Sequence, residues 1–235
     1  MKRKKTYAFT LIELFVVMAL MAIIVGIAIP SMSGTTRQVT LACTEISGQI
    51  ELARAYAVTH NCYTAVIFPQ MSELQHLLPT SAAERAQALS FAAYFNASCR
   101  TAIVEKDERN NNQYYFVMWV PDSSWKVLAN GALITEQDDF GVKVRKVPVG
   151  SLRRFARGAM GTAVKEASET VDMERCIVFS RGGQLEGGDS NSMNIVLRPG
   201  SYNLATRKFT PAAANTRYSV LSINPRSGRT TVTYR

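Results

Sequence analysis

The feature that most constrains this chain is an apolar run from Phe9 to Ile29, in which Glu13 is the only charged residue. Four basic residues precede the run at positions 2–5, and Pro30 follows it. A helix rises about 1.5 Å per residue, so the run could span roughly 31 Å, the thickness of a hydrocarbon core. The run therefore predicts a membrane-spanning helix, and the basic residues predict a cytoplasmic N-terminus.

A carboxylate inside such a run needs an explanation, because placing it in a membrane costs about 3 kcal/mol. One interpretation is that Glu13 reaches the lipid headgroups, since it lies only four residues beyond Phe9. The other starts from a cut between Ala8 and Phe9, which would create an α-amino group about 6 Å along the helix from Glu13. That amine could neutralise the Glu13 of a neighbouring copy, which makes Glu13 a candidate residue for filament assembly.

The sequence around this cut, Lys-Lys-Thr-Tyr-Ala8 followed by Phe9-Thr-Leu-Ile-Glu13-Leu, resembles the cleavage and N-methylation motif of type IV prepilins and type II secretion pseudopilins. The resemblance implies cleavage by prepilin peptidase after Ala8, methylation of Phe9 and assembly into a helical filament. The chain departs from the family pattern at Ala8, where glycine is usual. A secretory signal peptide fits less well, because its apolar core is about 7–15 residues long. An uncleaved membrane anchor is the remaining alternative.

A second helical pattern follows Pro30. Apolar residues recur at spacings of four and three, at Val39, Cys43, Ile46, Ile50, Ala53 and Ala57. This spacing predicts an amphipathic helix that continues to about residue 59, with Glu51 and Arg54 on its solvated faces. The predicted organisation is a leader at 1–8, a transmembrane helix at 9–29, the amphipathic helix at 30–59 and a globular β-rich head at 60–235. The fold class is α+β, with the C-terminal half of a long membrane-spanning α-helix packed on an antiparallel β-sheet.

The head consists of short strand-like runs separated by turn signals. The runs lie at 62–68, 100–105, 114–120, 125–128, 132–134, 142–147, 176–180, 194–197, 218–223 and 229–234. Asn130-Gly131 predicts a hairpin, and Pro199-Gly200 predicts the end of a strand. An Ala-rich helix from 82 to about 95 is expected between the first two strands, because Ser81 and Glu84 form a capping box.

Three segments narrow the resemblance to the H-type minor pseudopilins and related minor pilins. They are the helix end at 52–58, the Phe-Ser-Arg-Gly-Gly turn at 179–183 and the Asn-Pro-Arg-Ser-Gly-Arg turn at 224–229. The resemblance implies a minor subunit of a type II secretion or type IV pilus-like filament.

The sequence contains no recognisable catalytic or metal-binding motif. His60 and His76 are isolated, and no phosphate-binding loop or nucleophile elbow is present. We therefore predict a structural protein that is not an enzyme and uses no cofactor or metal. The four cysteines form no CxxC pair. Cys62 and Cys99 each begin a strand-like run and are the candidate disulfide, with buried free thiols as the alternative.

Basic residues are concentrated near the C-terminus of this chain of net charge +9, and no acidic residue follows Asp189. Arg217, Arg226, Arg229 and Arg235 could neutralise phosphates, which predicts an alternative function as a DNA-binding minor pilin in DNA uptake. A second acid-free stretch holds Lys143, Arg145, Lys146, Arg153, Arg154 and Arg157. The bland interpretation is that these charges keep edge strands soluble or pair with acidic residues elsewhere.

Together these observations predict a structural minor pilin or pseudopilin. Its expected partners are other pilin-type subunits, prepilin peptidase and inner-membrane lipid, with DNA less favoured. Its expected location is the bacterial inner membrane, as a single-pass protein with a cytoplasmic N-terminus and a C-terminal domain that is periplasmic or, in the filament, extracellular.

Overall fold

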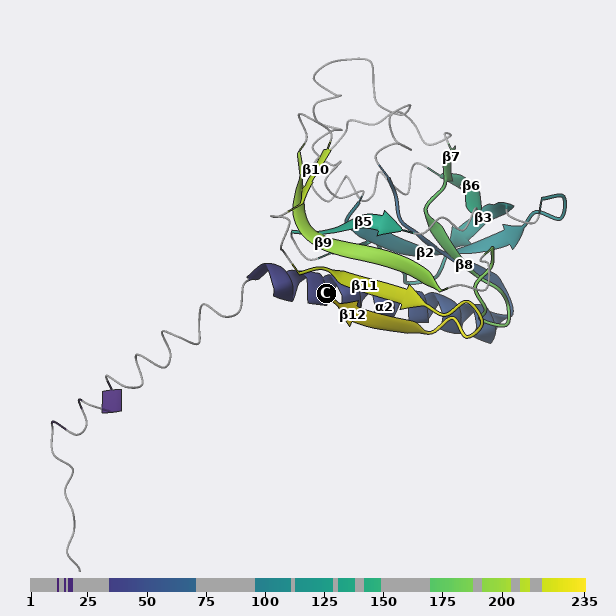
Figure 1. The fold of residues 1–235 in the computed structure, drawn as a ribbon. Coiled ribbons are helices and arrows are strands. Elements are labelled where there is room, and N and C mark those ends of the chain that lie inside the picture. The colour runs from purple at the N-terminus through teal and green to yellow at the C-terminus, as the bar shows by residue number, and fades with distance from the viewer. Residues whose placement is uncertain are drawn as a thin grey trace, which may run out of the picture.

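The computed structural model describes residues 12, 15, 17–18, 34–70, 96–110, 113–128, 131–137, 142–148, 170–187, 192–203, 208–211 and 217–235. Within these residues, helix α2 (Gly34–His60) lies across two β-sheets (Figure 1). We call α2 and the two sheets the folded unit. The predicted helix at 82–95 lies outside the described residues.

Helix α2 forms because its apolar residues recur on one face. Every member of the predicted stripe is buried, with at most 2% of its surface exposed: Val39, Cys43, Ile46, Ile50, Ala53 and Ala57. The helix ends at His60, and the next residue, Asn61, adopts a φ of 49°. The N–H of Cys62 then donates to the carbonyl of Ala57 at 3.1 Å, which satisfies an otherwise free carbonyl of the last turn. The predicted stripe is therefore confirmed.

The first sheet contains seven strands of the described chain. They are β1 (Tyr63–Ile67), β2 (Ser98–Lys106), β3 (Gln113–Trp119), β4 (Lys126–Val127), β6 (Lys143–Pro148), β7 (Thr170–Met173) and β8 (Cys176–Phe179). Six of them follow the order β7-β6-β3-β2-β1-β8, and the short β4 pairs with β2. The β3–β6 pairing is parallel, whereas the other pairings in this sheet are antiparallel.

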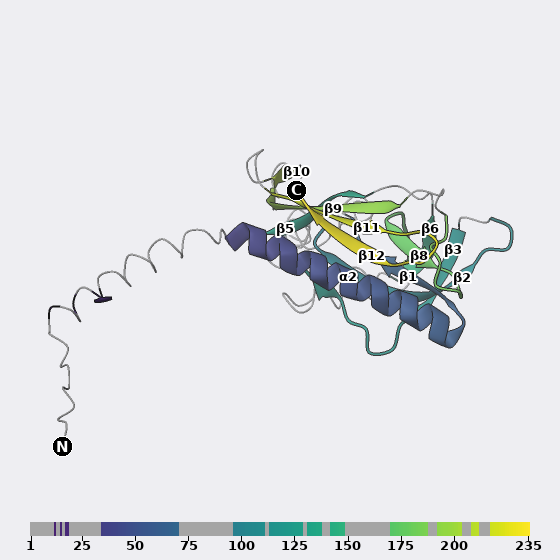
Figure 2. The same ribbon diagram turned by 60° about the horizontal axis from the view of Figure 1, so that its bottom comes forward.

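The second sheet contains five described strands: β5 (Ala132–Gln137), β9 (Met193–Asn203), β10 (Lys208–Pro211), β11 (Ser219–Ile223) and β12 (Thr230–Tyr234). Four follow the order β10-β9-β11-β12, and β5 pairs with β9. Figure 2 shows α2 running beneath the strands of both sheets, so that one helix joins them.

Two apolar clusters hold the folded unit together. The larger lies between α2 and both sheets and includes Ile46, Ile177 and Leu221. The smaller lies on the opposite face of the first sheet and includes Ile67 and Val144. Successive residues of a strand point to opposite faces, so β1 contributes to both clusters. Each large buried side chain stabilises the folded state by about 1.5–3 kcal/mol.

The predicted fold class is wrong in its main element. The described residues show a β-rich unit covered by α2, and none of their helices has both the length and the apolar character needed to cross a bilayer. Charged residues explain this for α2, because Arg37, Glu45, Glu51 and Arg54 interrupt its outer surface. Helix α2 is amphipathic and covers a core, as predicted for its residues.

Two predicted turns are also corrected. The Asn130-Gly131 pair does not connect a hairpin, because β4 pairs with β2 and β5 pairs with β9. Strand β9 does not end at Pro199-Gly200 but continues to Asn203. Proline lacks an N–H, and here the neighbouring Gly200 supplies the hydrogen bond, donating to the carbonyl of Gly131 at 2.9 Å.

Candidate functional site

The predicted processing and assembly residues, Ala8, Phe9 and Glu13, lie outside the described residues. Four described residues between positions 12 and 18 are helical and expose much of their apolar surface: Ile12 (71%), Phe15 (72%), Val17 (49%) and Met18 (65%). Nothing in the described part of the chain covers these side chains. An apolar surface of this kind marks a segment that binds lipid or another protein.

The three segments quoted for the H-type resemblance meet at one point, which we call the Arg54 junction. It consists of Arg54 and Val58 on α2, Gly183 in the turn after β8 and Gly228 in the turn between β11 and β12. A Cβ on Gly228 would lie 2.4 Å from the carbonyl oxygen of Gly183 and 2.8 Å from Cδ of Arg54. A Cβ on Gly183 would lie 2.8 Å from Cγ2 of Val58. With φ values of 77° and 64°, both positions require glycine.

The two turns of the junction are held by their own hydrogen bonds and by one to each other. Oδ1 of Asn224 accepts from the N–H groups of Arg226 and Ser227, at 3.0 Å each. The N–H of Gly228 donates to the carbonyl of Asn224 at 2.7 Å. The N–H of Leu185 donates to the carbonyl of Pro225 at 2.9 Å and so links the two turns. The turns therefore pack on α2 as one body.

Glu51 fixes the start of β12 to α2. Its carboxylate accepts from the N–H of Thr230 at 3.4 Å and from Nη1 of Arg54 at 3.3 Å. Oγ of Ser47 and Oγ1 of Thr230 share a hydrogen bond of 2.7 Å. Glu51 and Arg54 were predicted on the solvated faces of α2; both keep part of their surface exposed and are half-buried at this contact. The glycines of the two turns were the available signal, because glycine marks a close approach of backbone to another element.

The four candidate nucleic-acid residues do not form one cluster. Arg217 and Arg235 flank the open end of the β11–β12 hairpin, where Tyr218 and Arg235 pair through both main-chain hydrogen bonds. Arg226 and Arg229 lie in the turn at the other end. The hairpin strands are five residues long, so the two pairs are separated by about 17 Å. All four side chains are exposed, but the structure divides them between two ends.

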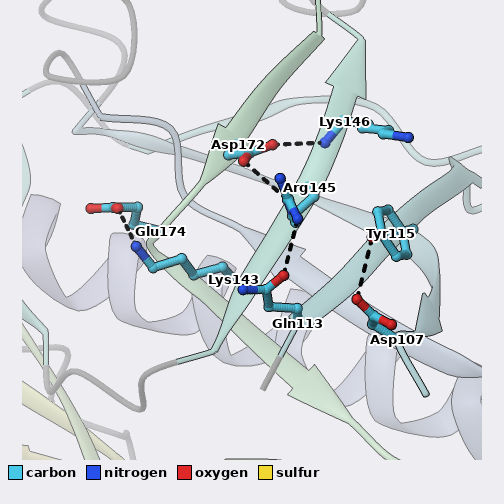
Figure 3. A network of polar contacts seen from close by, with 8 residues as sticks. All are labelled: Asp107, Gln113, Tyr115, Lys143, Arg145, Lys146, Asp172 and Glu174. Atoms are coloured by element: carbon cyan, nitrogen blue, oxygen red, sulfur yellow. Dashed lines mark hydrogen bonds and ion pairs between the residues drawn. The ribbon is translucent and has the colours of Figure 1, made fainter. Parts of the chain in front are cut away.

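Acidic residues in and just after β7 pair with two of the three described basic side chains of the second basic stretch (Figure 3). Lys143 forms an ion pair with Glu174. Nε of Arg145 lies 3.2 Å from Oδ2 of Asp172, whose Oδ1 accepts from the main-chain N–H of Lys146 at 3.1 Å. These pairs are on the surface and each contributes at most about 1 kcal/mol. They nevertheless compete with any phosphate for the same guanidinium and ammonium groups.

The candidate Cys62–Cys99 disulfide is not formed, and all four cysteines are free thiols. Strands β1 and β2 are antiparallel, with Tyr63 opposite Val104. Two residues that each begin a strand therefore lie at opposite ends of the pair, about 20 Å apart. A disulfide requires Cα atoms within about 7 Å. The disulfide prediction was wrong because it treated the starts of the two strands as neighbours in space.

A polar group that the sequence did not reveal joins β2, β3 and the turn after β8. The hydroxyl of Tyr114 donates to Oε2 of Glu186 at 2.7 Å, and Nζ of Lys106 lies 2.9 Å from the same oxygen. Burial, and then the hydrogen bond to Glu186, raise the pKa of Tyr114 well above its usual value. The tyrosine is therefore a permanent donor. No group of three metal-ligating side chains occurs among the described residues.

We predict that the folded unit loses stability at alkaline pH partly through Cys99. Burial, with the carboxylate of Glu45 adding to it, raises the pKa of this thiol from 9.0 to about 12. Because the thiol ionises more easily in the unfolded chain, its contribution to the free energy of unfolding is fully present below pH 9. That contribution falls as the pH rises towards 12, by up to about 4 kcal/mol. Denaturant unfolding of the reduced protein between pH 8 and 12 measures this loss. Cys99→Ala should be less stable at pH 8 but should lose less between pH 9 and 12, and equal losses would contradict the prediction.

The N-terminal segment matches a known protein-family motif. Residues 3–29 match the prokaryotic N-terminal methylation motif. The match supports the type IV pilin-like and pseudopilin family, and hence a subunit that prepilin peptidase processes and that assembles with other pilin-type subunits. No curated protein and no solved structure matches the chain. The match ends before α2, so the H-type assignment rests on the resemblance of three short segments.

Proposed function

We propose that this chain, with its pilin-type methylation motif, is a minor structural subunit of a type II secretion or type IV pilus-like filament. The single observation that carries the proposal is the motif at residues 3–29. In this proposal prepilin peptidase cuts after Ala8, and the new N-terminus at Phe9 is methylated. Glu13 then pairs with the amine of a neighbouring subunit during assembly.

The exposed N-terminal side chains support this role. Ile12, Phe15 and Met18 each leave more than 60% of their surface exposed in the isolated chain. Covering a side chain of this size stabilises an assembly by about 1.5–3 kcal/mol. Neighbouring subunits in a filament would supply that cover. Before assembly, the lipid of the bacterial inner membrane would supply it, with the N-terminus facing the cytoplasm.

The packing of the folded unit is consistent with the proposed structural role. Its most specific contact is the Arg54 junction, where two glycine turns pack on α2 and fix the C-terminal hairpin. This arrangement supplies rigidity at the end of α2 and brings no nucleophile, base and acid together. The function proposed for the folded unit is to present fixed surfaces to other subunits, without enzymatic activity of its own.

DNA binding is the alternative of a different class. It would need Arg217, Arg226, Arg229 and Arg235 to follow one phosphate path. Their division between the two ends of the β11–β12 hairpin argues against such a path. We therefore place the filament role first.

We predict that the mature protein begins at methylated Phe9. Expression in a host with prepilin peptidase, followed by intact-mass measurement and N-terminal sequencing, tests this directly. The expected mass is that of residues 9–235 plus one methyl group. In a host without the peptidase, the chain should begin at Met1.

Ala8→Gly is the matched control, because it restores the residue usual in the family and should be cut at the same bond at least as fast. A wild-type chain that still begins at Met1 in the first host, or that begins beyond Ile29, would contradict the proposed function.

A further inference from the structure

The N-terminal end of α2 lies beside the β5 and β9 strands. A Cβ on Gly131, at the start of β5, would lie 2.8 Å from Oε1 of Gln38 in the second turn of α2. The carbonyl of Gly131 accepts from Gly200 of β9 at 2.9 Å. Arg37, next to Gln38, is exposed, and the first turn of α2 contains no acidic residue. Arg37 is therefore one residue from the α2 side chain that meets Gly131, and Gly131 pairs with Gly200, two residues from Arg198 on β9.

Arg198 connects this region to the C-terminus. Its guanidinium lies 4.8 Å from the centre of the Tyr218 ring. The main chain of Tyr218 pairs with that of Arg235 in both directions, at 2.8 and 2.9 Å. Figures 1 and 2 both place the C-terminus towards the end of the folded unit at which α2 begins. We call the three exposed arginines at this end, Arg37, Arg217 and Arg235, the basic end.

In the described part of the chain, β9, β11 and β12 contain no acidic residue, and β5 contains one, Glu136, which lies opposite Val196 of β9. No acidic residue follows Asp189 in the sequence. On α2 the first acidic residue after Arg37 is Glu45, about 12 Å along the helix. That distance exceeds the screening length of about 8 Å at physiological salt, so Glu45 does little to neutralise Arg37. Two tyrosines lie at the same end: Tyr218 and Tyr234, the latter with 57% of its surface exposed.

We propose that the basic end rests on the anionic phospholipid headgroups of the membrane from which the N-terminal segment emerges. The inference rests on the proposed function, because that function puts residues 9–29 at the inner membrane. One guanidinium group can bind two oxygens of a phosphate at once. Each basic residue near an anionic leaflet strengthens binding about fivefold. Tyrosine is enriched at headgroup level. The contact would fix the orientation of α2 to the membrane surface before the subunit enters a filament.

The position of the basic end in the fold favours lipid over nucleic acid as its ligand. The basic end lies where the chain continues into residues 1–33, so a headgroup surface would reach it without any further binding step. The other exposed arginines of the hairpin, Arg226 and Arg229, lie at the far end and do not extend the patch into a path for a duplex.

The test is hydrogen exchange of the full-length protein in two kinds of lipid nanodisc. One kind contains phosphatidylcholine alone, and the other contains phosphatidylcholine with phosphatidylglycerol. We expect peptides that cover residues 34–40 and 217–220 to exchange about fivefold or more slowly in the anionic discs, following the gain per basic residue. The difference should disappear in R37Q/R217Q/R235Q and at high salt. The matched control R226Q/R229Q removes charge at the far end and should keep the full difference.

Each outcome separates the two proposals. Equal exchange in both discs, or an equal loss in the control variant, overturns the basic end as a lipid contact and leaves the proposed function standing. A chain that enters neither disc contradicts the proposed function instead. Duplex DNA, added without lipid, is the third arm. Slower exchange of the same peptides with DNA but not with anionic discs would assign the surface to nucleic acid and overturn the lipid proposal.

Discussion

Replacing Gly228 by alanine is expected to lower the free energy of unfolding of the folded unit by about 3 kcal/mol. Two costs combine. A φ of 64° is unfavourable for alanine by about 1–2 kcal/mol. The new Cβ would also lie 2.4 Å from the carbonyl oxygen of Gly183, so backbone must move on at least one side. The Gly183 turn is tied to its neighbour through Leu185 and Pro225, and it cannot move alone.

Denaturant unfolding measures this effect, and Gly48→Ala is the matched control. Gly48 lies within α2, and a Cβ there would meet nothing within 4 Å. Alanine at this exposed helical position should stabilise the folded unit by about 0.5–1 kcal/mol. The same chemical change therefore has opposite signs at the two sites. Ordinary surface substitutions change the free energy of unfolding by less than about 0.5 kcal/mol. A change that small in Gly228→Ala would contradict the close packing described for the Arg54 junction.

The buried face of α2 was predictable because it depends on local spacing alone. The six apolar residues of the stripe between Val39 and Ala57 repeat with the period of a helix, and the structure buries all six. The alternation in β11 has the same origin, and its residues 219, 221 and 223 are buried. Patterns of this kind need no knowledge of which element packs against which.

Strand pairing was not predictable in the same way, because it depends on contacts far apart in sequence. Asn130-Gly131 has the composition of a hairpin turn, yet its flanking strands join different sheets. The error in the Cys62–Cys99 disulfide also came from pairing, since antiparallel register places the two strand starts at opposite ends.

The candidate site likewise has one part that local sequence predicts and one part that depends on contacts far apart in sequence. The processing motif is contiguous, so a reading of residues 8–14 and a family match to residues 3–29 agree. The Arg54 junction is assembled from three distant segments. Their residues were visible in the sequence, but their contact depends on the packing of β8 and of the β11–β12 hairpin on α2.

Glu13→Ala should leave cleavage after Ala8 intact and reduce incorporation into filaments about tenfold or more, because losing a buried ion pair costs about 3–5 kcal/mol. Apolar packing of the N-terminal segments alone would permit many axial positions, because the hydrophobic effect is non-directional. In the proposed assembly, a charge pair between Glu13 and a neighbouring amine would favour one of these positions. The variant should therefore accumulate as a processed subunit that fails to assemble.

The measurement compares two fractions from the same cells, the processed subunit in membranes and the subunit in sheared filaments. Glu45→Ala is the matched control, because Glu45 is an exposed carboxylate on α2 and should not alter either fraction. Glu13→Asp keeps the charge on a shorter side chain and should restore part of the assembly, since a carboxylate is still present to meet the amine. Normal incorporation of Glu13→Ala would show that Glu13 has no part in assembly. If Glu13→Asp did not relieve the defect, the length or packing of the Glu13 side chain, and not its charge, would be what assembly requires.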